Sequence, residues 1–209
     1  MKAVLFDLDG TLHDRNATVL RWLEGHTRRF TLPAAYAARF VALDDFGYRP
    51  KAEVMPLLVQ EFRLAYSAQT LLGDFTAHFM VAPVVMVHAH AVLRQLRERG
   101  VRIGVVTNGW PEMQSACLNR CRLSERVDDV VISKAVGLSK PDPAIYRLAL
   151  ERLNVSAADT WFVGDSPRND ITGPQTVGLR TAFLPTGHAL TGETPDAVLE
   201  DLRAVLTLN

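Results

Sequence analysis

The chain has 209 residues, of which 48% are apolar and 22% charged, and its 23 Lys and Arg residues balance its 23 Asp and Glu residues. This composition is typical of a globular protein with one sizeable core. Zero net charge gives no general attraction to nucleic acid or to an anionic membrane. There are only two cysteines, and no run approaches the ~20 apolar residues of a membrane span. We therefore expect a cytoplasmic, soluble protein with neither nucleic acid nor membrane as a partner.

The first segment of the chain predicts a strand. Residues 3–6, Ala-Val-Leu-Phe, are continuously apolar, as is usual for parallel strands that are covered on both faces. From about residue 15 to residue 80 the apolar residues follow helical spacing. Pro33, Gly47, Pro50 and Gly73 divide this stretch into four or five helices.

From about residue 83 onward, strands and helices alternate. The pattern predicts strands at 101–106, 127–132, 160–163 and 179–184, and helices at 87–99, 111–120, 143–153, 169–177 and 195–206. Such alternation is typical of a parallel sheet with right-handed crossovers. The predicted fold class is α/β, a Rossmann-like, doubly wound parallel sheet with helices on both faces. Residues 1–14 and 84–209 would form this core, and residues 15–83 an inserted helical cap.

Polar clusters follow the predicted strands. Because the carboxyl ends of parallel strands meet at one edge of a sheet, these clusters converge there. Taken by itself, the first cluster, at residues 7–11, could be a polar turn or part of a calcium loop. The clusters are 7–11 (Asp-Leu-Asp-Gly-Thr), 107–109 (Thr-Asn-Gly), 139–143 (Ser-Lys-Pro-Asp-Pro) and 164–170 (Gly-Asp-Ser-Pro-Arg-Asn-Asp).

In this order, the four clusters resemble the four motifs of the haloacid dehalogenase-like superfamily. The chain looks like one of its phosphatases, with a helical cap between the first and second motifs. The resemblance implies a Mg²⁺-dependent phosphatase that acts on a small phosphorylated metabolite, as a monomer or a homodimer. The dehalogenase branch lacks a second Asp, so Asp9 favours phosphate chemistry. A phosphomutase and a non-catalytic binding protein on the same fold remain alternatives.

The resemblance also implies roles for individual residues. Asp7 would be the nucleophile that forms an aspartyl-phosphate, and Asp9 would protonate the leaving oxygen and then deprotonate water. The Thr107 hydroxyl and the Asn108 main-chain N–H would hold phosphoryl oxygens. Lys140 would neutralise negative charge on the nucleophile and the phosphoryl group.

A magnesium site is implied beside these residues. Asp7, the main-chain carbonyl of Asp9 and Asp165 would be its ligands, since Mg²⁺ prefers hard oxygen ligands. Asp170 would hold a metal-bound water. The alternative for Asp170 is an acid that is favoured at a helix N-terminus.

Selectivity for the leaving group is expected in the inserted segment. The loop at residues 46–51 carries Arg49 and Lys51, and one of these cations would meet a polar or anionic leaving group. The alternative is that both are ordinary surface cations. His13 departs from the small or acidic residue that the family often has after the first motif, with no effect assigned to it.

Overall fold

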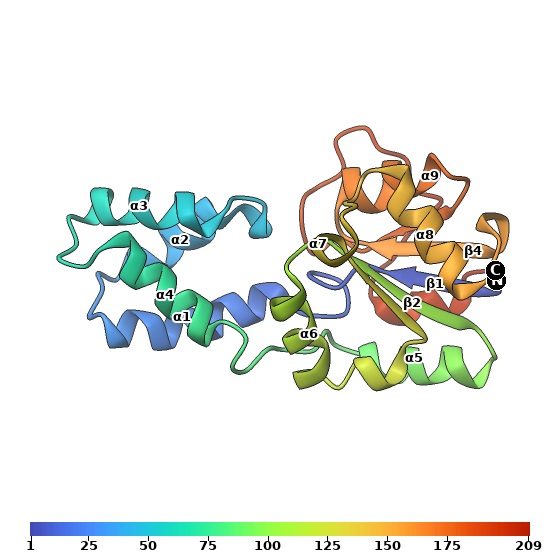
Figure 1. The fold of residues 1–209 in the computed structure, drawn as a ribbon, viewed down its shortest axis with the longest axis horizontal. Helices are drawn as coiled ribbons and strands as arrows, with labels where there is room; N and C mark the ends of the chain where they lie inside the picture. The colour runs from blue at the N-terminus through green and yellow to red at the C-terminus, as the bar shows by residue number, and fades with distance from the viewer. The chain divides into compact units, whose positions relative to one another are not determined.

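A single parallel sheet of six strands organises the fold (Figure 1). The computed structural model describes residues 1–209. The strand order is β3-β2-β1-β4-β5-β6, and it reverses between β1 and β4, where open α/β sheets form their ligand-binding crevices. The predicted α/β fold class is therefore confirmed. The strands are β1 (Ala3–Phe6), β2 (Arg102–Thr107), β3 (Asp129–Ile132), β4 (Thr160–Gly164), β5 (Arg180–Phe183) and β6 (Ala197–Val198).

The central strand β1 is fully buried, as its continuous apolar sequence predicts. Leu5 pairs in register with Gly104 of β2 and with Phe162 of β4. The ladder continues beyond the end of β1, because the Asp7 main-chain N–H donates to the Val163 carbonyl at 2.9 Å. The main chain of Asp7 is therefore part of the sheet.

Helices cover the sheet on both sides (Figure 1). Helix α8 packs against β2 and β3, and α5 packs against β2. Leu5, Tyr146 and Phe162 belong to the hydrophobic cluster between the sheet and α8. The helices of this part of the chain are α5 (Ala89–Glu98), α6 (Pro111–Arg120), α7 (Ser133–Val136), α8 (Pro143–Leu153) and α9 (Gly173–Gln175), with short 3-10 helices at Ser124–Arg126 and Ala157–Asp159.

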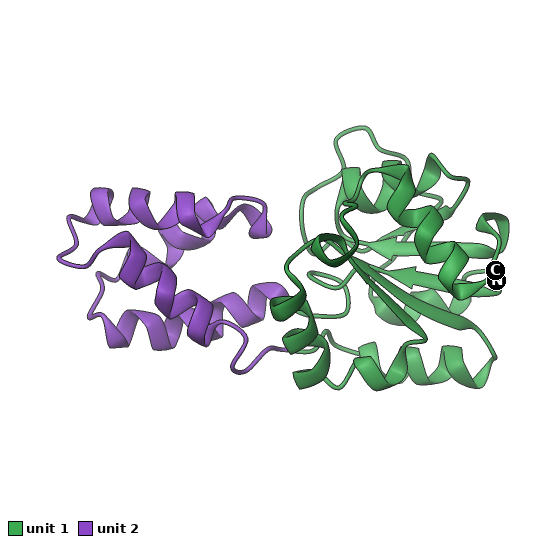
Figure 2. Ribbon diagram, in the orientation of Figure 1, with its two compact units in different colours: residues 1–14, 85–209 green, residues 15–84 purple.

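The chain divides into two compact units, which Figure 2 colours separately. Unit 1 comprises residues 1–14 and 85–209 and contains the sheet, and unit 2 comprises residues 15–84. The regular secondary structure of unit 2 is entirely helical, and the Trp22 indole contacts Phe40 and Phe75 at ring-centroid distances of 4.9 and 5.1 Å. Its helices are α1 (Arg15–Arg29), α2 (Tyr36–Asp44), α3 (Lys51–Phe62) and α4 (Ala68–His78), with a 3-10 helix at Asp45–Gly47.

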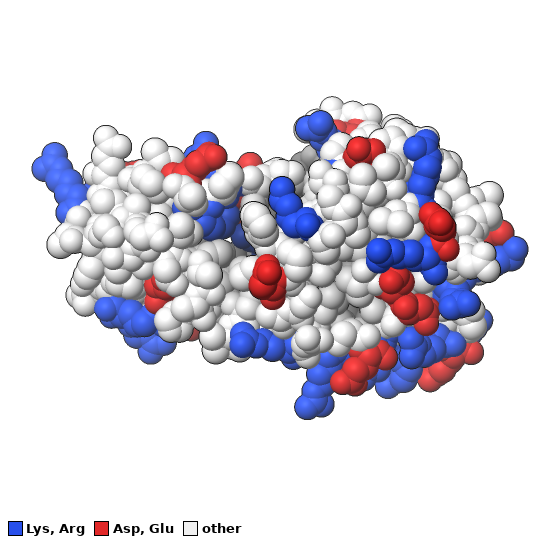
Figure 3. Space-filling model, viewed as in Figure 1, with Lys and Arg blue, Asp and Glu red and all other residues white.

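The surface carries charges of both signs. In the view of Figure 3, side chains of opposite charge lie beside one another, which accords with the equal numbers of acidic and basic residues. None of the helices combines the length and the apolar character that a membrane crossing requires.

Two predicted helices are wrong. In place of a helix at 195–206 the structure has strand β6 and a 3-10 helix at Leu202–Thr207. The Asp196 carboxylate accepts from the Thr181 main-chain N–H at 2.7 Å, which holds the segment extended alongside β5. The helix predicted at 169–177 is instead a π-helix at Pro167–Thr172 followed by α9. Pro174 lacks an N–H, so a regular α-helix cannot run through it without losing a hydrogen bond.

Candidate active site

A buried lysine joins two carboxylates at the carboxyl edge of the sheet. Lys140 Nζ donates to Asp7 Oδ1 and to Asp170 Oδ1, each at 2.7 Å. Asp7 follows β1, and Asp170 lies in the π-helix that follows β4. All three side chains are buried, with Asp170 completely inaccessible to solvent. The first, third and fourth sequence clusters thus meet at one point.

The position of Lys140 depends on Asn108, which follows β2. The Asn108 amide donates from Nδ2 to the Lys140 carbonyl and accepts from the Lys140 main-chain N–H at Oδ1, both at 2.9 Å. The Lys140 ammonium also lies 5.4 Å from the centroid of the Phe162 ring. The sequence indicated only a main-chain role for Asn108, whereas its side chain fixes the loop that carries the lysine.

The π-helix after β4 fixes Asp170. Its Oδ2 accepts from the Ser166 main-chain N–H at 2.9 Å, and the Ser166 hydroxyl accepts from the Asn169 main-chain N–H at 3.2 Å. Both oxygens of Asp170 therefore have a donor within unit 1. With a donor at each oxygen, the Asp170 carboxylate is fixed and can in turn hold the Lys140 ammonium in place.

Burial perturbs the ionisable groups of this cluster. Desolvation raises the pKa of Asp7, and neighbouring Asp170 raises it further, although Lys140 opposes both. Desolvation also raises the pKa of Asp165, and the charges of Asp7 and Asp170 add to the effect. Burial alone would lower the pKa of Lys140, but the two carboxylates beside it raise it instead. The cluster is therefore short of positive charge.

The oxygen atoms of the cluster fit a divalent cation. Asp7, Asp165 and Asp170 each offer a carboxylate oxygen, and these oxygens lie within 4.8 Å of one another. Three ionised carboxylates around a single ammonium leave two negative charges unbalanced, which one divalent ion would offset. Gly10 leaves the space that the Asp165 carboxylate occupies, since a Cβ at this position would collide with it. Hard oxygen donors in such a group suit magnesium or a similar ion.

Asp9 and Thr107 lie beside this cluster and share a partner that sequence reasoning missed. Gln114 Nε2 donates to Asp9 Oδ2 and to Thr107 Oγ1, both at 3.0 Å. Gln114 is on α6, where the buried positions 114, 117 and 118 follow helical spacing. A polar residue on an otherwise apolar helix face was the signal that was available, because a buried amide requires hydrogen-bond partners.

The two cations predicted to meet the leaving group are in unit 2. Lys51 Nζ lies 2.5 Å from Asp44 Oδ1, and Arg15 donates to the same carboxylate at 2.6 and 3.0 Å. Desolvation would raise the pKa of Asp44, but these two cations lower it. Arg49 is exposed. Lys51 is therefore occupied by a buried ion pair, whereas Arg49 is on the surface.

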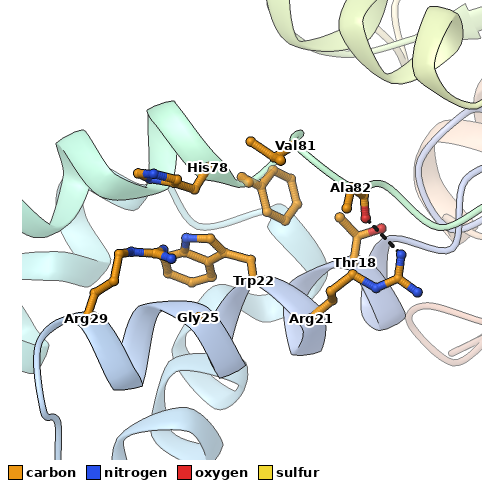
Figure 4. A pocket seen from close by; sticks show the side chains of 9 residues that line it. Thr18, Arg21, Trp22, Gly25, Arg29, His78, Val81 and Ala82 are labelled. Atoms are coloured by element: carbon orange, nitrogen blue, oxygen red, sulfur yellow. Dashed lines mark hydrogen bonds between the residues drawn. The ribbon is translucent and has the colours of Figure 1, made fainter.

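Unit 2 also contains a pocket of its own (Figure 4). The side chains of Trp22, Arg29 and His78 line it, and Arg21 donates to the Ala82 carbonyl at 3.2 Å along its rim. Asp74 binds Arg29 and His78 through its carboxylate. The Arg29 guanidinium is paired with a carboxylate of its own unit, so the pocket by itself indicates no ligand.

The chain is similar in sequence and in fold to known proteins. The sequence profile of the haloacid dehalogenase-like hydrolases matches residues 1–178. The chain is 28% identical to the glyceraldehyde 3-phosphate phosphatase of Pyrococcus abyssi, over 90% of the chain and 82% of that protein. It is 32% identical to the phosphoglycolate phosphatase of Rhodospirillum rubrum, over 90% of the chain and 81% of that protein. The fold matches the magnesium-bound putative HAD-hydrolase YfnB of Bacillus subtilis with a TM-score of 0.86, at 21% identity and covering 99% and 97% of the two chains.

Proposed function

The chain belongs to the haloacid dehalogenase-like hydrolases, and on this premise we propose that it is a magnesium-dependent phosphatase of small phosphorylated metabolites. One observation carries the proposal: Asp7, Asp165 and Asp170 converge around the Lys140 ammonium. Phosphoryl transfer needs positioning and positive charge more than covalent chemistry. This cluster supplies one buried ammonium and carboxylate oxygens that could hold a divalent cation. The names of the two relatives, a glyceraldehyde 3-phosphate phosphatase and a phosphoglycolate phosphatase, support the same substrate class.

In the proposed reaction a carboxylate oxygen of Asp7 attacks phosphorus. The bond from phosphorus to the leaving oxygen breaks, and that oxygen takes its electron pair together with the proton of the Asp9 carboxylic acid. Asp9, now ionised, accepts a proton from water as the water oxygen attacks the aspartyl-phosphate. The bond to Asp7 then breaks, its electron pair returns to the carboxylate, and inorganic phosphate leaves.

The remaining groups stabilise the charge that the phosphoryl group carries. Lys140 lies 2.7 Å from Asp7, so its ammonium reduces the repulsion between the attacking carboxylate and the phosphoryl oxygens. The Thr107 hydroxyl and the Asn108 main-chain N–H are the proposed donors to those oxygens. The Asn108 side chain keeps Lys140 in place through its two hydrogen bonds to the lysine main chain.

Asp7, Asp165 and the main-chain carbonyl of Asp9 are the proposed ligands of the magnesium ion, and Asp170 the proposed holder of its water. When bound, the ion supplies positive charge between the nucleophile and the phosphoryl oxygens. The raised pKa values of Asp7 and Asp165 support this assignment, because they indicate buried carboxylates that lack sufficient cationic partners.

We propose that unit 2 is a cap that selects the leaving group. It is inserted directly after the segment that carries Asp7 and Asp9, between Asp14 and Val85. Since Lys51 is bound by Asp44, the proposed contact with the leaving group now rests on Arg49. Arg49→Ala is expected to change the ranking of substrates, and Lys51→Ala mainly to reduce stability. An unchanged ranking in both variants would exclude the role.

The test is phosphate release from a panel of phosphorylated metabolites, with magnesium and with a chelator. Wild-type protein should release phosphate only with magnesium, and Asp7→Asn should abolish release. Asp159→Asn is the matched control, because Asp159 pairs with Lys2 at the opposite edge of the sheet and an exposed pair contributes little. An isomerised sugar phosphate in place of free phosphate would identify a phosphomutase. A folded protein that turns over no compound in the panel would favour a binding role.

A further inference from the structure

Two side chains outside the four motifs hold the carboxylate of Asp9. We infer that His13 and Gln114 are positioning residues, which fix the direction in which Asp9 gives and takes its proton. The inference rests on the proposed function, in which Asp9 is the general acid and base. Neither residue needs to touch the substrate, since each acts through Asp9.

His13 contacts one oxygen of this carboxylate. Its Nδ1 lies 2.6 Å from Asp9 Oδ1, and the imidazole is completely buried, whereas the Asp9 side chain is 28% exposed. The ionised carboxylate can only accept, so Nδ1 carries the hydrogen in that state. The His13 main chain is fixed as well, since its N–H donates to the Leu8 carbonyl and its carbonyl accepts from the Gly10 N–H, both at 2.8 Å. The buried imidazole is therefore a fixed partner for a carboxylate that burial encloses only in part.

Gln114 contacts the other oxygen. Its Nε2 lies 3.0 Å from Asp9 Oδ2, from Thr107 Oγ1 and from the Asn108 carbonyl oxygen. Two of these three atoms can only accept hydrogen bonds, so the orientation with the NH₂ group toward them is the one that satisfies them. The same amide therefore connects the general acid to the loop that is proposed to bind the phosphoryl group.

The loop after β2 leaves space for this amide. Gly109 has a φ of +154°, and a Cβ at this position would lie 2.7 Å from Gln114 Nε2. A side chain at residue 109 would push the amide away from Asp9 and Thr107. Glycine at position 109, in the second cluster, is therefore required so that the Gln114 amide has room beside the loop.

Together the two contacts restrain rotation of the Asp9 carboxyl group. Each oxygen of the carboxylate has a protein partner, His13 at Oδ1 and Gln114 at Oδ2. Rotation about the bond to the carboxyl carbon would break both contacts at once. Proton transfer is efficient only when the acid is aligned with the leaving oxygen, so losing either contact should weaken acid catalysis specifically.

The dependence on the leaving group separates positioning from mere structural support. A basic alkoxide needs the proton of Asp9 as its bond to phosphorus breaks, whereas the weakly basic p-nitrophenolate leaves without it. The ratio kcat/KM reports on all steps up to and including the first irreversible one. Cleavage of the bond between phosphorus and the leaving oxygen is among these steps. A defect in positioning should therefore lower kcat/KM for an alkyl phosphate far more than for p-nitrophenyl phosphate, whereas a general structural defect should lower both equally.

The experiment measures kcat/KM for p-nitrophenyl phosphate and for alkyl phosphates with the full-length protein and magnesium. His13→Leu and Gln114→Leu each remove one contact of the Asp9 carboxylate, and Gln114→Leu also removes the amide contacts with Thr107 and the Asn108 carbonyl. We expect each to lower kcat/KM for alkyl phosphates by about tenfold or more, a fraction of the 10²–10⁴-fold that general acid–base catalysis contributes. The value for p-nitrophenyl phosphate should change by less than about threefold. His13→Asn, whose amide can replace Nδ1–H as the donor, should restore much of the loss.

Two controls define the outcome. Asp9→Asn sets the largest selective effect, and Leu118→Ala, at a buried position one helical turn from Gln114, perturbs α6 but leaves His13 and Gln114 unchanged. Equal losses for all leaving groups in both His13→Leu and Gln114→Leu would overturn the inference. A wild-type protein that cleaves none of these esters would instead overturn the proposed function, and this inference with it.

Discussion

Asp74 of α4 is predicted to be a main determinant of the stability of unit 2. Its carboxylate accepts from Trp22 Nε1 at 3.1 Å and from Arg29 Nε and Nη2 at 2.6 and 2.8 Å. His26 Nδ1 lies 2.7 Å from the same carboxylate. Three side chains of α1 thus converge on one residue of α4. Asp74→Asn keeps the size and shape of the side chain, but its amide NH₂ group is a donor and would face the N–H groups that now donate to the carboxylate.

The magnitude follows from the pKa of Asp74. Burial would raise it, but hydrogen bonds from Arg29 and His26 lower it from 3.8 to about 2. At 1.36 kcal/mol for each pKa unit, the ionised carboxylate contributes about 2 kcal/mol to the free energy of unfolding. The misplaced amide N–H of the variant adds an unsatisfied donor. We therefore expect Asp74→Asn to lower the free energy of unfolding by about 2–4 kcal/mol at neutral pH.

The pH dependence of this loss gives a sharper test. Because the pKa of Asp74 is lower in the folded than in the unfolded state, its contribution is fully present well above pH 3.8 and disappears as the pH falls through about 2. At about pH 3 roughly half of it is lost, so the difference between wild type and variant should narrow by about 1 kcal/mol.

Urea denaturation at about pH 7 and about pH 3 measures both effects. Trp22 is the fluorescent reporter, in a background with Trp110→Phe and Trp161→Phe. Glu24→Gln, an exposed acid on α1, is the matched control and should change the free energy of unfolding by less than about 0.5 kcal/mol. A difference for Asp74→Asn that is as small as in this control, or that is the same at both pH values, would refute the reasoning.

Three further predictions concern unit 1. Lys140→Met removes the ammonium between two carboxylates and should lower kcat about 10²-fold or more in a phosphate-release assay; a smaller loss than tenfold would contradict its role. Asn108→Ala loses both hydrogen bonds to the Lys140 main chain and should lower kcat about tenfold, whereas activity equal to wild type would show that the loop holds itself. Magnesium at 100 times its Kd should stabilise the wild type by about 2.7 kcal/mol in thermal unfolding, and it should stabilise Asp165→Asn much less; equal stabilisation of both proteins would place the ion elsewhere.

The sheet and the convergence of the site were predictable because the first, second and fourth clusters directly follow apolar strands and the third lies a few residues after one. Asp7 follows β1 and Asp165 follows β4, so the position of each carboxylate depends on the strand before it. The contact of Gln114 with Asp9 joins residues 105 positions apart. The sequence predicted the helix at 111–120 but not which strand end its buried face meets, because that depends on tertiary packing.

The errors near the C-terminus have a related cause. A helix at 195–206 suits local propensity, but the Asp196 side chain bonds to the main chain of Thr181, and the Leu199 N–H donates to the Phe183 carbonyl at 2.8 Å. These bonds to β5 require an extended segment. A two-residue strand at the edge of a sheet is too short to leave a periodic pattern in the sequence.

The two segments that connect unit 2 to unit 1 lie side by side, which bears on how the inserted unit can be replaced. The Met86 N–H donates to the Leu12 carbonyl at 2.9 Å, and His13 is bridged to Val85 in antiparallel orientation. The chain therefore leaves and re-enters the sheet domain at adjacent points, as at the base of a hairpin. Since the entropy of closing a loop grows only logarithmically with its length, segments of very different size can be exchanged at this base with little thermodynamic penalty. Recombination at Asp14 and Val85 would thus exchange the inserted unit while the sheet and its site keep their own contacts.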